Sequence, residues 1–191
     1  MSKSNFKKMK NLLLTLLILI SSSLLAQTSY KLDGETSKMT VEGTSTLHDW
    51  ESDVEQIQGN ASLTLNGNVL TEIKSLSITI PVKSIKSGKS GMDSNTYNAL
   101  KESKNPNITF VLSSATISGT SVKAKGKLTI AGFTKETELT TTYKSTSNGI
   151  AFEGSSTFKM SEYKVDPPTA MMGTIKTGDS VTINFNVLFK N

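Results

Sequence analysis

The stretch Gly43-Thr44-Ser45-Thr46-Leu47-His48-Asp49-Trp50 holds the only histidine and the only tryptophan of the chain. Apolar and polar residues alternate on both sides of it, over residues 38–42 before it and 50–54 after it. Alternation with a period of two is typical of a strand that buries one face. We therefore interpret this stretch as the rim of a closed β-structure whose apolar faces surround a partly hollow interior.

The same alternation recurs along the rest of the chain, near residues 61–65, 76–82, 108–112, 122–130, 139–143, 152–160 and 181–189. Hairpin turns are predicted at Asn66-Gly67-Asn68 and Asn148-Gly149, because Asn and Gly tolerate the positive φ of tight turns. Pro81 indicates an edge position or a bulge. The pattern predicts an all-β fold of about eight antiparallel strands, which can close into a barrel or fold into a sandwich.

The alternation breaks once, between residues 86 and 106. Lys86-Ser87-Gly88-Lys89-Ser90-Gly91 has the composition of a flexible loop. Asp93 or Ser94 can cap a helix, and Asn105-Pro106 can end it. One short helix is therefore predicted near residues 94–103, across one end of the barrel.

The first 26 residues differ in kind from the rest. Four lysines precede an apolar run over Leu12–Ile20, and a cut after Ala26 would follow Leu24-Leu25. This layout predicts a secretory signal peptide at residues 1–26 and a single exported domain at residues 27–191, periplasmic or secreted. An uncleaved anchor is the alternative, although the apolar run is shorter than the ~20 residues of a membrane-spanning helix. The mature chain is expected to have no stable membrane span.

Composition excludes several function classes. The chain has no cysteine, so disulfides, thiolate metal sites and thiol nucleophiles are excluded. It has 21 basic residues against 16 acidic ones, and four of the lysines lie in the leader, which has no acid; the remaining 17 against 16 give the mature domain +1. All basic residues are lysine, so the bidentate contacts that arginine makes with phosphate and guanine are absent. No nucleic-acid partner is expected.

The usual catalytic constellations are also absent from the sequence. One histidine without cysteine cannot assemble a strong zinc site from its preferred ligands. Gly88-Lys89-Ser90-Gly91 lacks the spacing of a P-loop, and no Gly-x-Ser-x-Gly motif occurs. His48 beside Asp49 leaves a hydrolase or isomerase as one hypothesis, although neighbours on a strand point to opposite faces. We predict a protein that is not an enzyme and has no cofactor, metal or catalytic residue.

Small residues in the middle of two inward faces predict an interior with free volume. Ala124 and Gly126 lie on one strand, and Gly154 and Ser156 on another. An eight-stranded barrel is wide enough to hold one small ligand, although glycine can also serve to bend a strand. Strand parity predicts a ligand-binding lining of Val41, His48, Trp50, Ile78, Ile80, Phe110, Leu112, Val122, Ala124, Gly126, Leu128, Phe152, Phe158, Met160, Ile183, Phe185 and Val187.

The mouth of this interior is predicted to lie near His48, Trp50 and the loops at residues 86–93 and 163–174, where a polar head group would sit. Met171-Met172 in the second loop is either an adaptable apolar lid or ordinary packing.

Three stretches of sequence occur in a characteristic order. They are Ser37-Lys38-Met39-Thr40-Val41-Glu42-Gly43; Met92-Asp93 followed by Leu100 and Asn105-Pro106-Asn107-Ile108-Thr109-Phe110; and Gly126-Lys127-Leu128-Thr129-Ile130-Ala131-Gly132-Phe133-Thr134-Lys135. With them the chain resembles, over about residues 29–190, the YceI-like family of bacterial periplasmic or secreted polyisoprenoid-binding proteins. The resemblance implies an eight-stranded antiparallel lipocalin-like barrel with a helix near one end, a long isoprenoid or similar amphiphile inside it, and no catalysis. Met92 stands where many members have arginine, which leaves a neutral head group such as a quinone or an amide open beside a pyrophosphate.

The leading hypothesis is therefore an exported protein that holds a polyprenyl, quinone or fatty-acyl chain for transport or storage. The alternative is a non-catalytic structural or protein-interaction barrel with a filled interior. A homodimer is left open.

Overall fold

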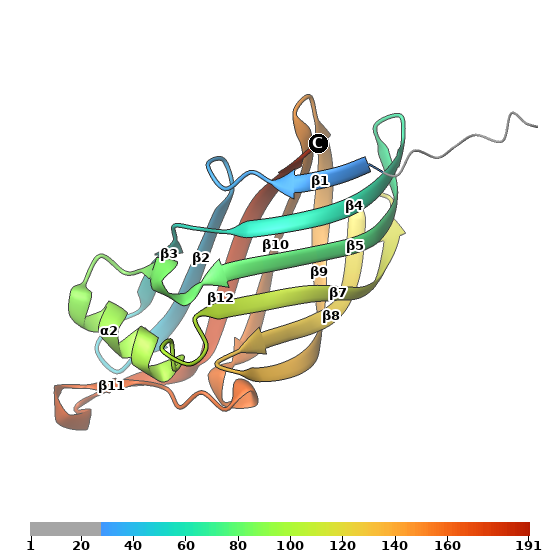
Figure 1. The fold of residues 1–191 in the computed structure, drawn as a ribbon. Coiled ribbons are helices and arrows are strands. Elements are labelled where there is room, and N and C mark those ends of the chain that lie inside the picture. Colours follow the sequence, from blue (N-terminus) through green and yellow to red (C-terminus); the bar gives the residue numbers. More distant parts are fainter. Residues whose placement is uncertain (1–27) are drawn as a thin grey trace, which may run out of the picture.

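Eight strands form a closed ring in the computed structural model, which describes residues 28–191 and so leaves the predicted leader outside the described residues (Figure 1). The ring closes because residues 31 and 32 of its first strand pair with residues 190 and 189 of its last. All neighbours are antiparallel, so the predicted barrel is confirmed. In order around the ring the strands are β1 (Thr28–Leu32), β4 (Gln58–Asn66), β5 (Val69–Pro81), β7 (Asn107–Ser118), β8 (Ser121–Ile130), β9 (Phe133–Thr146), β10 (Gly149–Lys159) and β12 (Ile175–Lys190).

The last strand changes partners along its length. The C-terminal end of β12 pairs with β1, whereas residues 177–186 pair with β2 (Lys38–Ser45). The sheet then continues from β2 to β3 (Trp50–Val54) and β6 (Ile85–Lys86). One end of the molecule therefore carries three strands beyond the ring, together with α2 (Ser90–Ala99) and β11 (Thr169–Ala170) (Figure 1). We call this the helix end, and the opposite end, with the β4–β5 and β9–β10 turns, the hairpin end.

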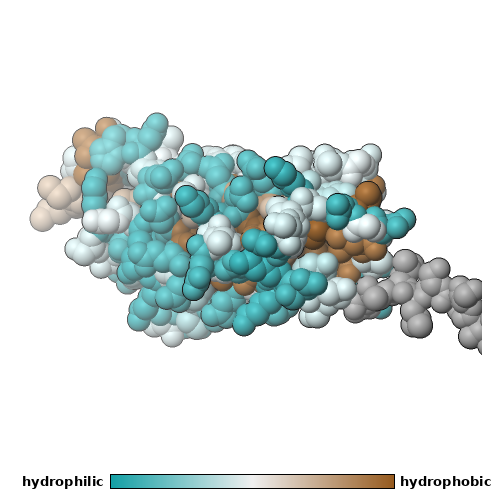
Figure 2. Space-filling view, turned by 90° about the horizontal axis from the view of Figure 1, so that it is seen from above, coloured by the Kyte–Doolittle hydropathy of each residue, from teal (hydrophilic) through white to brown (hydrophobic). Residues whose placement is uncertain are grey.

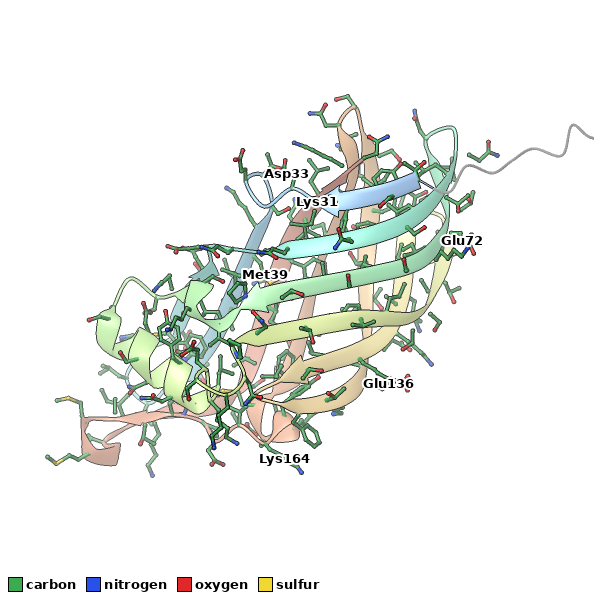
Figure 3. The ribbon with its side chains drawn as sticks, viewed as in Figure 1. Lys31, Asp33, Met39, Glu72, Glu136 and Lys164 are labelled. Carbon is green, nitrogen blue, oxygen red and sulfur yellow. The ribbon has the colours of Figure 1, made fainter. Side chains whose placement is uncertain are left out.

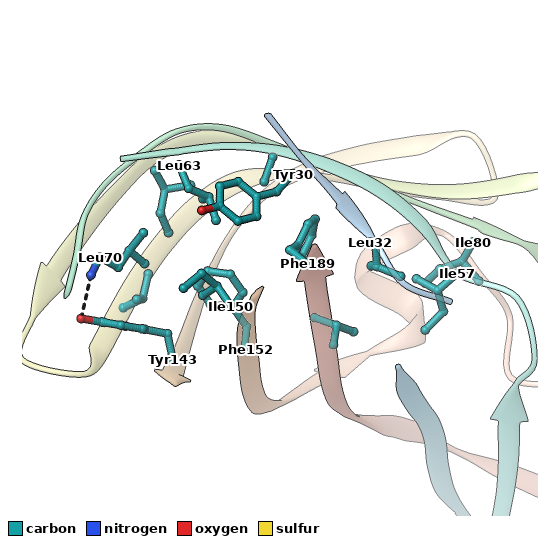
Figure 4. Packing of buried hydrophobic residues seen from close by; sticks show 14 of the residues in the cluster. Tyr30, Leu32, Ile57, Leu63, Leu70, Ile80, Tyr143, Ile150, Phe152 and Phe189 are labelled. Carbon is teal, nitrogen blue, oxygen red and sulfur yellow. Dashed lines mark hydrogen bonds between the residues drawn. The ribbon is translucent and has the colours of Figure 1, made fainter. Parts of the chain in front are cut away.

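The hairpin end is filled with side chains (Figure 4). Leu63 and Phe189 are fully buried there, and Phe189 meets Phe152 edge to face with 5.9 Å between ring centroids. The Tyr143 hydroxyl accepts a hydrogen bond of 3.1 Å from the backbone N–H of Leu70. Such packing anchors the ring, because each fully buried side chain of this size contributes about 1.5–3 kcal/mol through burial. Further buried members of this cluster are Tyr30, Leu32, Ile57, Ile73, Val122, Ile150 and Val187.

The outer face of the ring is polar, as the alternation predicts. Charged side chains such as Glu136 point away from the sheet (Figure 3), and hydrophilic residues cover most of the face seen in Figure 2. Within residues 28–191, no helix has the length and apolar character needed to cross a membrane.

The one helix is confirmed, although it spans residues 90–99 instead of 94–103. Asp93 does not cap the helix, because its carboxylate accepts hydrogen bonds from the backbone and side chain of Ser87. The helix stops before Lys101, whose backbone is left-handed with φ 54°. Pro81 was expected at an edge or bulge; it is the last residue of β5, a strand that lies between β4 and β7.

An ion pair reinforces the closure of the ring. Asp33, just after β1, pairs with Lys190 at the end of β12 and also accepts a 2.8 Å hydrogen bond from the Thr36 hydroxyl (Figure 3). The hydrogen bonds from Lys190 and Thr36 lower the pKa of Asp33 from 3.8 to about 2. A carboxylate with a depressed pKa stabilises the fold above its unfolded pKa, and this contribution is lost as the pH falls towards the folded value.

The Asp33→Asn variant is therefore expected to melt at a lower temperature than the wild type at neutral pH. The difference should shrink as the pH is lowered from 3.8 towards 2, where the wild-type carboxylate becomes protonated. Thermal unfolding followed by circular dichroism over this range checks the prediction. A difference that stays constant with pH would contradict it.

Candidate ligand-binding cavity

A cavity of about 810 Å³ lies inside the helix end. Its lining is contributed by β2 and β3, by the ends of β5, β7, β8, β10 and β12 that reach this end, and by α2, β11 and η3 (Met171–Gly173). The volume falls within the ~300–1,000 Å³ range of ligand pockets. The interior is thus filled at the hairpin end and hollow at the helix end.

The walls of the cavity are apolar because inward-facing residues of neighbouring strands meet there. Val41 of β2 pairs with Ile183 of β12, and Ile80 of β5 pairs with Ile108 of β7. Direct partners in an antiparallel sheet share one face, and all four side chains line the cavity. Further apolar wall residues are Met39, Val54, Ile85, Ile130, Phe158, Val165 and Val181.

A second buried cluster supports the wall near η2 (Met160–Tyr163). It consists of Ile130, Tyr163 and Val165, and Tyr163 meets Phe158 edge to face with 5.2 Å between ring centroids. Burial raises the pKa of the Tyr163 hydroxyl above its usual value of 10.0. Tyr163 therefore adds a neutral phenol, and no negative charge, to this wall near physiological pH.

Polar groups gather towards the mouth of the cavity. Ser45 ends β2 and His48 lies in the β2–β3 turn. Lys89, Asn95 and Thr96 come from α2 and the residue before it. Among the described residues that line the cavity, Lys89 is the one lysine, and aspartate and glutamate are absent. The electrostatics of the lining thus favour oxygen-bearing neutral or anionic groups over cationic ones.

The His48 ring is oriented by the main chain. Its Nδ1 lies 2.6 Å from the backbone carbonyl oxygen of Asp49, and its backbone N–H donates to the Ser45 hydroxyl oxygen at 3.2 Å. The observed contact of His48 with Asp49 therefore involves the carbonyl and not the carboxylate that a general-base pair would use. Within residues 28–191, no three His, Asp or Glu side chains are grouped so as to hold a metal ion.

Trp50 is fixed at the edge of the cavity by its neighbours on β2. Its Nε1–H donates a 3.0 Å hydrogen bond to the Thr44 carbonyl, and its ring lies over Gly43, its direct partner across the two strands. A Cβ at residue 43 would lie 2.8 Å from the Cε2 atom of the Trp50 ring. Glycine is thus required at residue 43 for the ring to occupy this position.

The Gly43→Ala variant is expected to displace the Trp50 ring and to lower the free energy of unfolding by about 1–3 kcal/mol, as overpacking usually does. Trp50 is the only tryptophan, so its emission spectrum reports the displacement directly. Gly91→Ala is the control, because an added Cβ there meets no atom within 4 Å. Identical emission spectra for Gly43→Ala and the wild type would refute this account of Gly43.

Polar contacts hold α2 beside the cavity, and Ala99 at its end packs against the second buried cluster. None of its residues is fully buried. The Tyr97 hydroxyl accepts a 2.8 Å hydrogen bond from Lys86 and lies 3.1 Å from the Ile85 carbonyl oxygen. The Asp93 carboxylate accepts from the Ser87 hydroxyl at 2.6 Å, and this hydrogen bond is the main cause that lowers the pKa of Asp93. These contacts tie α2 to β6 and the loop after it.

Comparison with known protein families shows to which family the chain belongs. The model of the YceI-like domain matches residues 30–189. The chain belongs to the YceI-like family.

Solved structures share this YceI-like fold. BcnA of Burkholderia cenocepacia is 20% identical with a TM-score of 0.68, covering 82% of this chain and 98% of its own. A polyisoprenoid binding domain from Saccharophagus degradans, implicated in plant cell wall breakdown, is 10% identical with a TM-score of 0.63, covering 84% and 97%. The YCEI protein of Campylobacter jejuni is 21% identical with a TM-score of 0.59, covering 73% and 84%. No match to this chain was found among curated proteins.

In this YceI-like chain, the structure divides the residues that strand parity predicted as ligand-binding. Seven of them line the cavity: Val41, His48, Trp50, Ile80, Phe158, Met160 and Ile183. Ten lie outside its lining, buried or half-buried in the packed parts of the ring: Ile78, Phe110, Leu112, Val122, Ala124, Gly126, Leu128, Phe152, Phe185 and Val187. Contact with a ligand remains a prediction for the first group.

The small residues do not create the hollow, and that part of the sequence interpretation is wrong. The ring of Phe110 covers Gly126, and a Cβ at residue 154 would lie 2.8 Å from the ring of Phe185. Aromatic side chains thus fill the space that the glycines leave. The volume lies instead at the helix end.

Sequence reasoning missed most of the lining that comes from outside the regular strands. Asn95, Thr96 and Ala99 of α2 line the cavity, although the helix has no clear apolar face in its sequence. The loops at residues 86–93 and 163–174 were expected at the mouth, and the structure places residues of both there. The expectation that the loops lie around the cavity mouth was therefore the sequence signal that pointed to this part of the lining.

Proposed function

We propose that the protein is an exported carrier that holds one amphiphile with a long apolar chain, an isoprenoid or a chain of similar character, in the cavity at the helix end. The observation that carries this proposal is a volume of about 810 Å³ that is open at a mouth and lined largely by apolar side chains, in a ring whose other end is filled. Burial of an apolar chain in such a space contributes about 25 cal/mol per Å². The role is binding, without catalysis.

The polar head of the ligand lies at the mouth in this proposal, near His48 and Lys89. Among the described residues that line the cavity, Lys89 carries a positive charge and no residue carries a carboxylate. A ligand head group with carbonyl, hydroxyl or anionic oxygens is therefore favoured. A quinone, a carboxylate and a phosphate all meet this requirement, whereas a quaternary ammonium does not.

Two further observations support the class of ligand and the place of action. The similar domain from Saccharophagus degradans is a polyisoprenoid binding domain, which favours an isoprenoid chain. The leader-like residues 1–26 precede the domain at residues 27–191 and support a periplasmic or secreted location. The carrier thus works outside the cytoplasm.

Titration of Trp50 fluorescence tests the proposal, because this single tryptophan lines the cavity. Geranylgeraniol, geranylgeranyl phosphate and palmitate are expected to give saturable changes in emission. Hexadecyltrimethylammonium matches palmitate in chain length but carries a cationic head, and it is expected to bind at least about tenfold more weakly, or 1.4 kcal/mol. No saturable change with any prenyl or acyl probe would overturn the proposal.

A further inference from the structure

We propose that the helix end docks on an anionic lipid bilayer, with Leu47, Met171 and Met172 entering the lipid at the mouth of the cavity. These side chains are 65%, 73% and 107% exposed, and all three line the cavity. We call them the apolar rim. The use of docking for ligand exchange rests on the proposed function, whereas docking itself is tested independently of it.

Hydrogen bonds hold the two loops of the apolar rim together. The backbone N–H of Thr46 donates to the Lys176 carbonyl at 2.9 Å, and the backbone N–H of Lys176 donates to the Thr46 hydroxyl oxygen at 3.1 Å. Leu47 follows Thr46 directly, and the methionines come just before Lys176 in the chain. Two loops far apart in sequence thereby border the same cavity. Hydrophobic atoms are visible at this end of the molecule, on the left in Figure 2.

The backbone directs the methionines outwards. Met171 and Met172 have φ values of 51° and 57°, and Gly173 has 86°. The left-handed region is unfavourable for residues with a Cβ, and strain of this kind concentrates at functional sites. Sulfur-bearing side chains project from the β11–β12 connection, away from the body of the protein (Figure 3). Of the two expected roles, ordinary packing is wrong, because the pair is exposed at the cavity lining.

The size of the apolar rim and the charge of the lysines near it fit a bilayer better than a protein partner. A stable protein interface buries about 800 Å² per partner, far more than three side chains on two loop tips provide. Insertion into lipid needs only a few apolar side chains, strengthened by basic residues facing anionic head groups. Lys89 lines the same mouth, and Lys176 follows the methionines; both are exposed, and no ion pair involves either within residues 28–191.

A bilayer is also the reservoir that the proposed ligand requires. A long apolar chain partitions out of water, so a carrier must collect it from lipid. Because the apolar rim lines the cavity mouth, a docked protein would receive the chain without exposing it to water. Docking and loading thus use the same end of the molecule.

Flotation with vesicles tests the proposal, using the exported form of the protein. Vesicles of phosphatidylcholine with one quarter phosphatidylglycerol are compared with pure phosphatidylcholine. The wild type is expected to float with the anionic vesicles, and Met171→Ser/Met172→Ser to bind them at least about tenfold more weakly. Val69→Ser is the matched control, because Val69 is 57% exposed but belongs to the hairpin end, and it should float like the wild type. Lys89→Gln/Lys176→Gln should reduce binding to anionic vesicles more than to neutral ones.

Equal flotation of the wild type and the methionine variant, or no flotation of the wild type, would overturn the proposal. So would a dimer in vesicle-free sedimentation that the methionine substitutions dissociate, because it would assign the apolar rim to a second copy. The geranylgeraniol titration of the wild type without vesicles separates the two proposals. Saturable binding there together with no flotation rejects docking alone, whereas flotation without ligand binding rejects the carrier function alone.

Discussion

The paired substitution Val41→Phe and Ile183→Phe is expected to weaken the binding of geranylgeraniol at least about tenfold while the protein stays folded. The two side chains are direct cross-strand partners on the cavity wall, so both new rings extend into the hollow. A tenfold loss is 1.4 kcal/mol, which corresponds to roughly 55 Å² of ligand surface excluded at 25 cal/mol per Å². Titration of Trp50 emission measures the effect, because neither substitution adds a tryptophan.

Val111→Phe is the matched control for this experiment. Val111 is 51% exposed and lies outside the cavity lining, so the same gain in side-chain size should leave the affinity unchanged. Unchanged affinity of the doubly substituted wall, with a normal melting temperature, would show that the ligand binds elsewhere.

The Phe189→Ala variant is expected to lose about 3–5 kcal/mol of unfolding free energy, the usual cost of truncating a fully buried phenylalanine. Phe189 is 0% exposed, packs edge to face on Phe152, and belongs to the residue pair that closes the ring between β1 and β12. Truncation of this side chain therefore both leaves a cavity at the hairpin end and weakens the closure of the ring. Urea denaturation followed by circular dichroism gives the value.

Phe189→Leu is the comparison variant, because it keeps much of the apolar volume. It should lose markedly less stability than Phe189→Ala. Both variants should retain geranylgeraniol affinity under conditions where they are folded, since Phe189 lies outside the cavity lining. A loss below about 1 kcal/mol for the alanine variant would contradict the assignment of Phe189 to the stabilising core.

Local patterns were sufficient to predict the strands of the ring, because alternation depends only on neighbouring residues. The turns at residues 66–68 and 148–149 were found because tight turns select particular residues. Gly149, for example, has φ 145° and lies against the Phe189 carbonyl, where a side chain would not fit. The single helix followed from the one break in the alternation. The number of one-sided strands left a sandwich open, and the resemblance to the YceI-like family implied the closed barrel.

The position of the hollow could not be predicted in the same way. It depends on β12, which pairs with β1 at its end and with β2 over residues 177–186, a long-range choice without a local signal. Parity identifies inward-facing residues but does not distinguish the two ends of the ring. Phe110 and Phe185 face inward like Ile183. Each of these two rings covers a glycine, however, and neither lines the cavity.

The exposure of Met171 and Met172 was likewise beyond a sequence interpretation. Apolar residues in a loop are compatible with a lid, with packing and with an exposed tip. The exposure of the two side chains excludes packing, and it depends on the folded chain.

Mass spectrometry of lipids extracted from the exported protein, purified from its own cells, tests the carrier function most directly. We predict about one amphiphile with a long apolar chain per wild-type molecule, and its loss from the Val41→Phe/Ile183→Phe variant. Wild-type protein that is consistently free of such a molecule, or equal amounts in the wild type and the blocked variant, would contradict the account.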